Sequence, residues 1–338
     1  MATVHFLNVG EGDCSIIQHN SGRVTMIDIC GGNETEELEE VAKILAYLQG
    51  VNQAAGRNYG MKEHPTNPIK YCKDNKIGAI WRFILTHPDM DHMDGLSNLF
   101  SDVTVGNFWE TGVRKAKPDF TKGKYNEADW DCYANLIAKK RQGVTILSNL
   151  AGAKFQFANE GDPEGHGDCL SIVAPDPGLV KAANEVEDTN DASYVIVYRS
   201  AGGRIVFPGD AHDGTWEYVL KHHRSLVENC AVLIAPHHGR HSDRSFEFLD
   251  VLNPKLTLFG CAPSEHLAYD AWNNRQLLHI TNNQAGNVVL KTTEAGIEVY
   301  VENEKFAESY NSVDVSRTHY GCYFIGIVPK PTAQAAAA

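Results

Sequence analysis

A short segment of the chain holds two imidazoles and two carboxylates that together could bind a metal ion: His87, Asp89, Asp91 and His92. The segment directly follows residues 80–85, an apolar run that is typical of a strand buried on both faces. A chain that turns sharply after such a strand can point neighbouring side chains at one place. Nitrogen and oxygen donors mixed in this way suit Zn, Mn or Fe. The segment therefore predicts a metal site at the end of a buried strand.

The same pattern recurs further along the chain, where apolar runs end in side chains that bind metals. Residues 205–207 are followed by Asp210, residues 232–234 by His237 and His238, and residues 24–27 by Asp28. An isolated carboxylate at a buried sheet edge is costly unless it is paired or bound to a metal. We therefore expect these strand ends to converge on one site.

The elements that must position these residues follow from hydrophobic periodicity. Strands are predicted at 4–9, 14–18, 24–29, 80–85, 103–109, 170–174, 194–198, 204–207, 231–235, 256–260, 288–291, 297–301 and 323–328. Helices are predicted at 34–48, 96–100, 128–141, 215–227, 246–252 and 268–280, and an acidic loop at 176–191. The mixture predicts an α/β fold. No Pro/Ser-rich linker divides the chain, so we expect one domain over residues 1–328, with insertions at about 33–78 and 110–165 and a disordered tail at 329–338.

Composition limits the classes of partner. The 338 residues include 30 Lys and Arg against 43 Asp and Glu, a net charge of −13, which disfavours long duplex DNA and anionic membranes. The eight cysteines show no CxxC spacing and lie in apolar stretches, which is typical of reduced thiols in a cytoplasmic protein. Neither a signal peptide nor a membrane span is predicted. Five histidines away from the motifs are interpreted as structural: His5, His19, His64, His279 and His319.

Taken together, the motifs resemble the metallo-β-lactamase superfamily. Within it they are most similar to the hydrolase domain attached to the bacterial competence DNA-uptake channel, and to its free-standing relatives. The resemblance rests on residues 8–13 (NVGEGD), 26–31 (MIDICG), 87–92, 190–193 (NDAS), 209–210, 236–239 (PHHG) and the closing pair 289–299. It spans about residues 3–301, and it is specific for fold rather than for substrate.

The resemblance implies an αββα sandwich with two divalent metal ions, Zn or Mn, at one edge. His87 and Asp89 face the first ion, Asp91 and His92 the second, Asp210 bridges both and His237 completes the second. Two cations at about 3.5–4 Å lower the pKa of a shared water, which gives a bridging hydroxide near neutral pH. Asp91 and His238 are the candidate catalytic residues, His238 either as proton donor to a leaving group or as a packing residue.

Two departures from the superfamily pattern affect the metals. Asp89 stands where a second histidine is usual, which makes the first site harder and favours Mn or Mg. The usual third-motif histidine is not evident. The candidates for this ligand are His166 or, as we favour, Asn190 and Asp191.

Further residues are candidates for substrate contact or for orienting the ligands. Asp28 either orients a ligand or closes a turn, and Asp13 either touches substrate or metal or forms an Asx-turn. The remaining candidates belong to the 190–193 motif or to a rim that could bind an anionic group: Ser193, Arg240, His241, Ser242 and His266.

Three functions compete on this sequence. The first is a dinuclear metal-dependent hydrolase of phosphodiesters, a nuclease or nucleotide phosphodiesterase, acting on an anionic small molecule or on short or single-stranded nucleic acid. The second is a lactone, thioester or β-lactam hydrolase on the same fold. The third is a weakly active, metal-stabilised subunit that binds a protein partner through the insertions.

Overall fold

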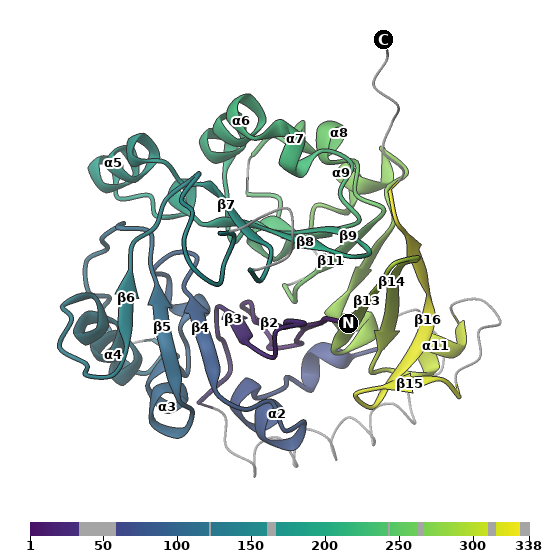
Figure 1. Ribbon diagram of the computed structural model, residues 1–338, viewed down its shortest axis with the longest axis horizontal. Coiled ribbons are helices and arrows are strands. Elements are labelled where there is room, and N and C mark those ends of the chain that lie inside the picture. Colours follow the sequence, from purple (N-terminus) through teal and green to yellow (C-terminus); the bar gives the residue numbers. More distant parts are fainter. Residues whose placement is uncertain are drawn as a thin grey trace.

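Two β-sheets packed face to face form the centre of the protein (Figure 1). The computed structural model describes residues 1–33, 59–121, 123–160, 167–242, 244–262, 266–309 and 316–331. In spatial order the ten-stranded sheet contains β15 (Thr318–His319), β16 (Cys322–Pro329), β14 (Gly296–Val301), β13 (Val288–Thr293), β1 (Thr3–Phe6), β2 (Ser15–Gln18), β3 (Val24–Ile27), β4 (Ile80–Ile84), β5 (Val105–Trp109) and β6 (Thr145–Leu147). The six-stranded sheet contains β12 (His279–Thr281), β11 (Leu256–Phe259), β10 (Val232–Ile234), β9 (Gly203–Phe207), β8 (Val195–Ser200) and β7 (Leu170–Ala174).

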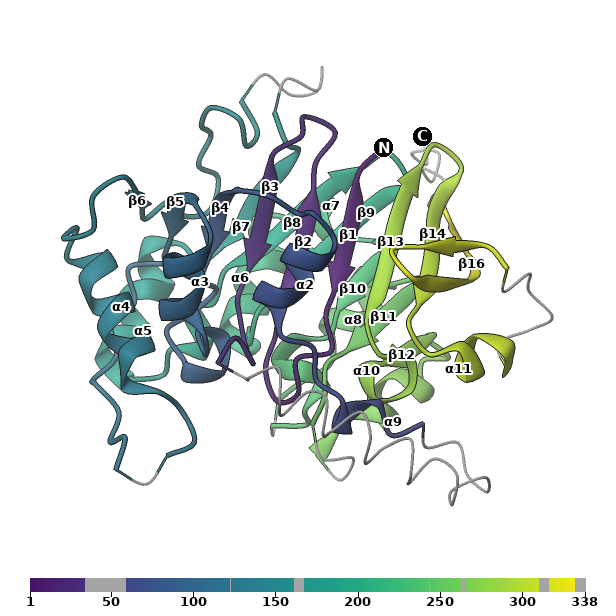
Figure 2. The ribbon, with the colours of Figure 1, turned by 90° about the horizontal axis from the view of Figure 1, so that it is seen from below.

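Helices cover the outer face of each sheet and make the predicted αββα sandwich. α2 (Pro68–Asp74), α3 (Leu96–Asp102) and α4 (Glu127–Ile137) pack on the ten-stranded sheet, and Figure 2 shows α2 and α3 in front of its strands. α6 (Asp213–His222), α7 (Arg224–Val227), α8 (Phe248–Leu252) and α9 (Tyr269–Asn273) pack on the six-stranded sheet. α5 (Pro177–Val186), α10 (Asn282–Ala285) and α11 (Glu304–Ser309) lie at the ends of the sheets. Among the described residues, no helix has both the length and the apolar character needed to cross a membrane.

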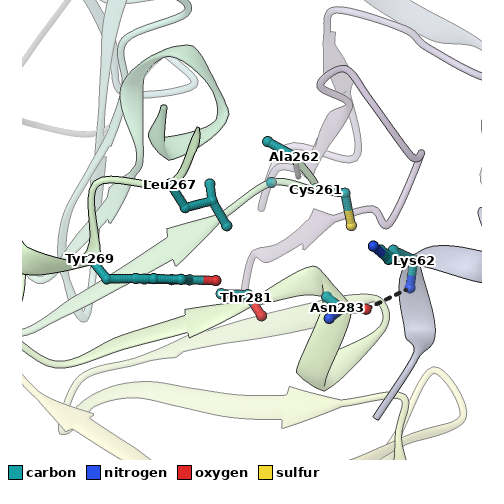
Figure 3. Close-up of a pocket in the computed structure, with 8 residues that line it drawn as sticks. Lys62, Cys261, Ala262, Leu267, Tyr269, Thr281 and Asn283 are labelled. Atoms are coloured by element: carbon teal, nitrogen blue, oxygen red, sulfur yellow. Dashed lines mark hydrogen bonds between the residues drawn. The ribbon is translucent and has the colours of Figure 1, made fainter. Parts of the chain in front are cut away.

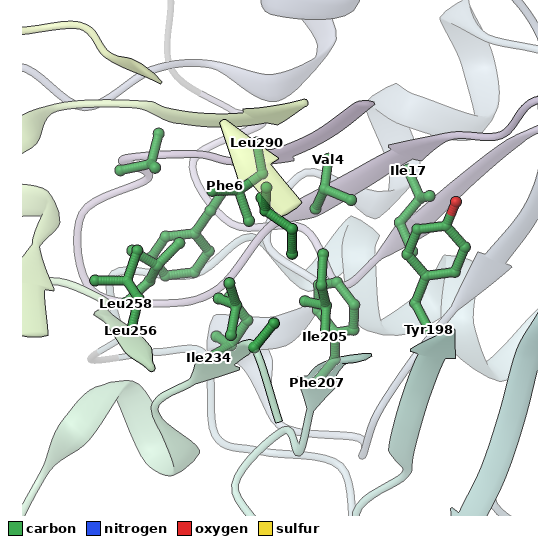
Figure 4. Close-up of a cluster of buried hydrophobic side chains, with 14 of the residues drawn as sticks. Val4, Phe6, Ile17, Tyr198, Ile205, Phe207, Ile234, Leu256, Leu258 and Leu290 are labelled. Atoms are coloured by element: carbon green, nitrogen blue, oxygen red, sulfur yellow. The ribbon is translucent and has the colours of Figure 1, made fainter. Parts of the chain in front are cut away.

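The main core lies between the sheets. Val4, Phe6 and Leu290 of the ten-stranded sheet face Ile205 and Ile234 of the six-stranded sheet (Figure 4), and all five are at most 4% exposed. His5 of β1 points the other way, with Nδ1 2.9 Å from the Tyr71 hydroxyl of α2, so β1 is buried on both faces. This packing fixes where the strand ends lie.

The strands that carry the candidate ligands end at one edge of the sandwich. β3 and β4 are parallel neighbours in one sheet, and β9 and β10 are parallel neighbours in the other. Because the carboxyl ends of parallel strands share an edge, the segments that follow them meet there. The β1–β2 turn, which carries Asp13, opens at the same edge, since β2 is antiparallel to β1 and β3.

Three predicted elements are wrong in detail. The acidic loop at 176–191 contains α5, because the Asp176 side chain caps it by accepting from the Leu179 amide and Pro177 begins it. The helix predicted at 215–227 is split at His223, whose φ of −134° is not helical. The helix predicted at 268–280 ends at Asn273, and β12 follows it as an edge strand parallel to β11.

Parts of the predicted insertions belong to the layers. The described part of 33–78 supplies α2, and 110–165 supplies α4 and β6. The predicted helix at 34–48 lies outside the described residues, as do residues 332–338 of the predicted tail. Pro329, the first residue of the predicted tail, is the last residue of β16.

Candidate metal centre

Three loops at the shared edge carry the densest group of imidazoles and carboxylates. The 3₁₀ turn η2 (Met90–His92) follows β4, Pro208–Asp210 follows β9, and the turn η4 (Pro236–Gly239) follows β10. Gly209 has a φ of +52°, and a Cβ there would lie 2.7 Å from the Cβ of Thr86. Only glycine therefore lets the β9 loop approach the β4 loop this closely.

Asp210 lies at the centre of this group. Its Oδ1 is 3.2 Å from His92 Nε2, and its Oδ2 is 3.6 Å from His237 Nε2, 3.8 Å from His238 Nε2 and 3.9 Å from His87 Nε2. The side chain is only 3% exposed. A single carboxylate surrounded by four imidazoles has the geometry to serve more than one cation.

Three sets of side chains in the described part of the chain could each hold a metal ion, with ligand atoms within 4.8 Å of one another. They are His87, His92 and Asp210; Asp91, His92 and His238; and Asp13, Asp210 and His238. Buried atoms in these sets have no hydrogen-bond partner: Asp13 Oδ1, His87 Nε2, His92 Nε2, Asp210 Oδ1 and His238 Nε2. Buried polar atoms are normally paired, so a set of orphaned donor atoms facing one point fits a bound cation.

The charges in the cluster support the same interpretation. Burial disfavours a charged His92 ring. The carboxylates of Asp210 and Asp28 nevertheless hold the pKa of His92 well above its usual range. In turn His92, ahead of the other imidazoles, holds the pKa of the buried Asp210 carboxyl well below its usual range. The carboxylates thus favour a positive charge at His92, and a bound cation would supply that charge in place of the proton.

Asp28 contacts the loop that carries the candidate ligands. Its Oδ1 accepts from the Thr86 amide at 2.7 Å, and its Oδ2 lies 2.7 Å from Thr86 Oγ1 and 2.8 Å from His92 Nδ1. This contact fixes the ring of His92 so that Nε2 faces Asp210, which is the usual arrangement behind a metal-binding histidine.

His238 and His237 are placed differently from the prediction. His238 is 1% exposed, belongs to two of the three sets and approaches Asp13 Oδ1 at 3.2 Å and Asp91 Oδ2 at 3.4 Å. Despite burial, Asp13 and Asp210 raise the pKa of His238 to about 10. His237, the predicted ligand, belongs to none of the sets; its side chain is 18% exposed, and Ser242 Oγ lies 3.1 Å from its Nδ1. Both residues have left-handed φ values, 53° and 57°, and both rings approach Asp210, but only His238 is fully buried.

Asp89 is engaged by other residues. Its Oδ1 accepts from Lys115 Nζ and Thr189 Oγ1, both at 2.6 Å, and lies 3.9 Å from His87 Nε2. These contacts and His87 hold the pKa of Asp89 below its usual range although burial acts against this. Asp89 is thus beside the first set but outside it.

Asn190 and Asp191, the favoured candidates for the third-motif ligand, have different surroundings in the structure. Asp191 turns its carboxylate to the start of α6, where Oδ1 accepts from the Thr215 amide at 3.0 Å. Asn190 Oδ1 is buried and has no hydrogen-bond partner among the described residues, so Asn190 is the better candidate of the two. His166 lies outside the described residues.

The remaining predicted contacts lie around the cluster. Ser193 Oγ is buried without a partner close to Gly209, and Arg240 is half-buried with its Nε unpartnered in the described chain. His241 and His266 are exposed, and the His241 amide donates to the His266 carbonyl at 2.8 Å. These two histidines form an outer rim and do not enter the cluster.

Sequence reasoning missed three residues: Lys115, His212 and Arg244. Lys115 comes from the region predicted as an insertion, 26 positions from the carboxylate it holds. The His212 ring stacks on His237 with centroids 5.7 Å apart, and its Nε2 is buried without a partner. His212 follows Asp210 by two residues, which was a usable signal, whereas nothing in the sequence distinguishes Arg244.

A cavity of about 240 Å³ adjoins the cluster at Gly260 (Figure 3). A Cβ at Gly260 would lie 3.2 Å from the Cβ of His238 and 3.3 Å from Asp13 Oδ1, so the wall of the cavity touches the candidate ligands. Lys62 extends its side chain toward Cys261, and the Tyr269 hydroxyl points toward Thr281. The lining combines one cation, hydroxyls and apolar side chains.

Comparisons with known proteins add little beyond this geometry. No family model and no curated protein matches the chain. A solved structure described as a new diphosphatase from the PhnP family matches with a TM-score of 0.40 and 14% sequence identity, over 83% of this chain and 94% of that one. So distant a likeness supports no conclusion on activity, and the candidate centre stands on its own residues.

Proposed function

We propose that this protein is a metal-dependent phosphoesterase that binds two divalent ions and hydrolyses phosphodiesters. One observation carries the proposal: the buried carboxylate of Asp210 lies within 3.9 Å of four imidazoles, beside donor atoms that have no partner. A carboxylate in this position can bridge two cations, as dinuclear hydrolases require.

The sets of donors suggest how the ions are shared. His87, His92 and Asp210 would hold one ion, and Asp91, Asp13 and His238 would hold the other with Asp210 between them. When bound, such ions activate water and stabilise charge on the phosphoryl oxygens. We assign His238 to metal binding rather than to proton donation, because its Nε2 faces both Asp91 and Asp210.

The substrate class follows from charge and space. A metal site with several carboxylate oxygens favours hard cations such as Mn or Mg. These cations in turn bind phosphoryl oxygens, which are hard ligands. The net charge of −13 favours a small or single-stranded substrate. The cavity at Gly260 provides room for an organic group of the ester next to the cluster.

The test is a matrix of substrates and metals. Protein stripped with EDTA is reloaded with Mn or Zn and assayed with bis-p-nitrophenyl phosphate, a thioester and nitrocefin. We expect phosphodiester cleavage that is stronger with Mn, and in Asp89→His a shift of the optimum toward Zn. Hydrolysis of only the thioester or nitrocefin, with Zn preferred, would replace the proposal with carbonyl hydrolysis. No turnover at all would favour a partner-binding subunit.

A further inference from the structure

Arg244 is a buried cation that has no counter-ion in contact within the described part of the chain. The residue is 7% exposed, and no carboxylate of the described chain lies within ion-pair distance of it. Burial lowers its pKa to about 10, so the guanidinium remains charged at neutral pH. A buried charge that is not paired is destabilising, so its retention calls for an explanation.

One edge of the Arg244 guanidinium has no hydrogen-bond partner among the described residues. Nη1 donates to the Ala211 carbonyl at 2.9 Å, while Nε and Nη2 have no partner among the described residues. In two other arginines of the protein, the same Nε/Nη2 edge binds a carboxylate. Arg23 uses it to hold Asp168 at 2.9 Å through each nitrogen, and Arg275 holds Asp250 at 2.7 and 3.3 Å. This edge presents two parallel N–H groups, which match two oxygens of a carboxylate or a phosphate.

The position of Arg244 relates it to the candidate metal centre. Its hydrogen bond to Ala211 ties it to the residue directly after Asp210. The next residue, Ser245, donates its amide to both carboxylate oxygens of Asp213 at 3.0 and 3.1 Å, which anchors the loop to the start of α6. Ala211 also directly precedes His212, whose ring stacks on His237 with centroids 5.7 Å apart, so the backbone that Arg244 holds leads into both parts of the centre.

We propose that Arg244, through its Nε/Nη2 edge, forms an oxyanion subsite beside the candidate metal centre that holds two oxygens of the substrate's phosphoryl group. The choice of a phosphoryl group as the ligand of this subsite rests on the proposed function. His212 Nε2, buried next to His237 and without a hydrogen-bond partner among the described residues, is a third polar atom available to this subsite, after Nε and Nη2 of Arg244. The geometry gives a reason for a rigid, planar cation here: two convergent N–H groups recognise a phosphoryl group better than a point charge does.

The experiment measures binding separately from turnover. Mn-loaded wild type, Arg244→Gln and Arg244→Lys are titrated calorimetrically with inorganic phosphate and, in a second arm, with acetate. Metal content and melting temperature are recorded for each protein. Arg275→Gln is the matched control, because it removes a half-buried guanidinium that already holds a carboxylate, Asp250. We expect phosphate to bind at least 10-fold more weakly to Arg244→Gln than to wild type, with metal content unchanged.

Each result decides the proposal. Arg244→Lys keeps the charge but lacks the two-pronged edge, so its phosphate affinity should stay below that of wild type by about 5-fold or more. If Arg244→Gln does not fold, this second variant carries the test. Phosphate affinity within twofold of wild type in a folded Arg244 variant overturns the subsite, as does acetate binding that equals phosphate binding. Phosphate binding that depends on Arg244 in a protein without esterase activity would refute only the proposed function.

Discussion

At the scale of single residues, Asp210 is the side chain on which the candidate centre depends. We expect Asp210→Asn to reduce bound metal from about two ions per chain to well below one. The amide keeps the shape of the side chain but removes the negative charge between four imidazoles. Elemental analysis after equilibrium dialysis measures the change.

The control for Asp210→Asn is Asp250→Asn, an exposed carboxylate that pairs with Arg275 far from the centre. It should retain wild-type metal content. Both variants should keep the far-UV circular dichroism of the wild type. Two ions per chain in Asp210→Asn would show that Asp210 is not the bridge.

Lys115 would compete with a metal ion for Asp89, if Asp89 is a ligand as the sequence predicts. Its ammonium lies 2.6 Å from Asp89 Oδ1, so a cation bound there must displace it or use the other oxygen. We expect Lys115→Met to bind Mn several-fold more tightly than wild type, which a competitive titration with a fluorescent chelator measures. Lys117→Met, which removes an ammonium paired with Glu127 and Asp131, is the matched control. Equal or weaker Mn affinity in Lys115→Met would mean that Lys115 supports the site instead.

At the scale of elements, the turn η4 aims His238 into the cluster through strained backbone. His237 and His238 have left-handed φ values, which cost about 1–3 kcal/mol each in a non-glycine residue. Gly239 then follows with a φ of +87°, and a Cβ there would lie 2.1 Å from the ring of buried Phe259. The turn therefore needs glycine for two reasons, conformation and space.

We expect Gly239→Ala to lower the free energy of unfolding by about 2–4 kcal/mol, since the added methyl group must displace a packed ring. Gly22→Ala is the matched control, because Gly22 has a similar φ of +84° and a Cβ there meets nothing within 4 Å. Gly22→Ala should therefore show only the conformational part, about 1 kcal/mol. Urea denaturation of both variants in EDTA measures the difference, and equal losses would remove the steric part of the argument.

At the scale of the whole molecule, buried histidines link stability to pH. His5 joins β1 to β2 and α2, with Nε2 2.9 Å from Gln18 Oε1 and Nδ1 2.9 Å from the Tyr71 hydroxyl. Burial lowers its pKa from 6.5 to about 4. Between these two values the unfolded chain binds a proton that the folded chain does not. The contribution of a neutral, buried His5 to stability is therefore full above pH 6.5 and is lost as the pH falls toward 4.

The expected slope for His5 is up to about 1.4 kcal/mol of unfolding free energy per pH unit inside that window. His19, whose pKa burial lowers to about 3, adds a further loss in the same direction. Urea denaturation from pH 7 to pH 4.5 in EDTA, which removes metal effects, measures the slope. His5→Gln should be less stable than wild type at pH 7 yet show a smaller slope. An unchanged slope would place the pH dependence elsewhere.

The sequence by itself determined which segments form the buried strands and which side chains follow them. The runs before Asp28, His87, Asp210 and His237 are apolar on both faces, and only an αββα sandwich buries both faces of two sheets. The structure confirms that fold class and brings the four strand ends to one edge. Periodicity predicted less well where local signals compete, as at α5, whose Asp-Pro start is also typical of a turn.

Tertiary structure alone decided how the side chains at that edge are used. The order of His237 and His238 in the chain does not say which ring is fully buried, because the left-handed backbone of both residues sets how each ring approaches Asp210. Lys115 and Arg244 meet the candidate centre through long-range packing, and no local pattern marks either residue. Hydrophobic patterning is local and periodic, so a sequence expresses it directly. Contacts between charged side chains depend on distances across loops, and only the folded chain fixes those.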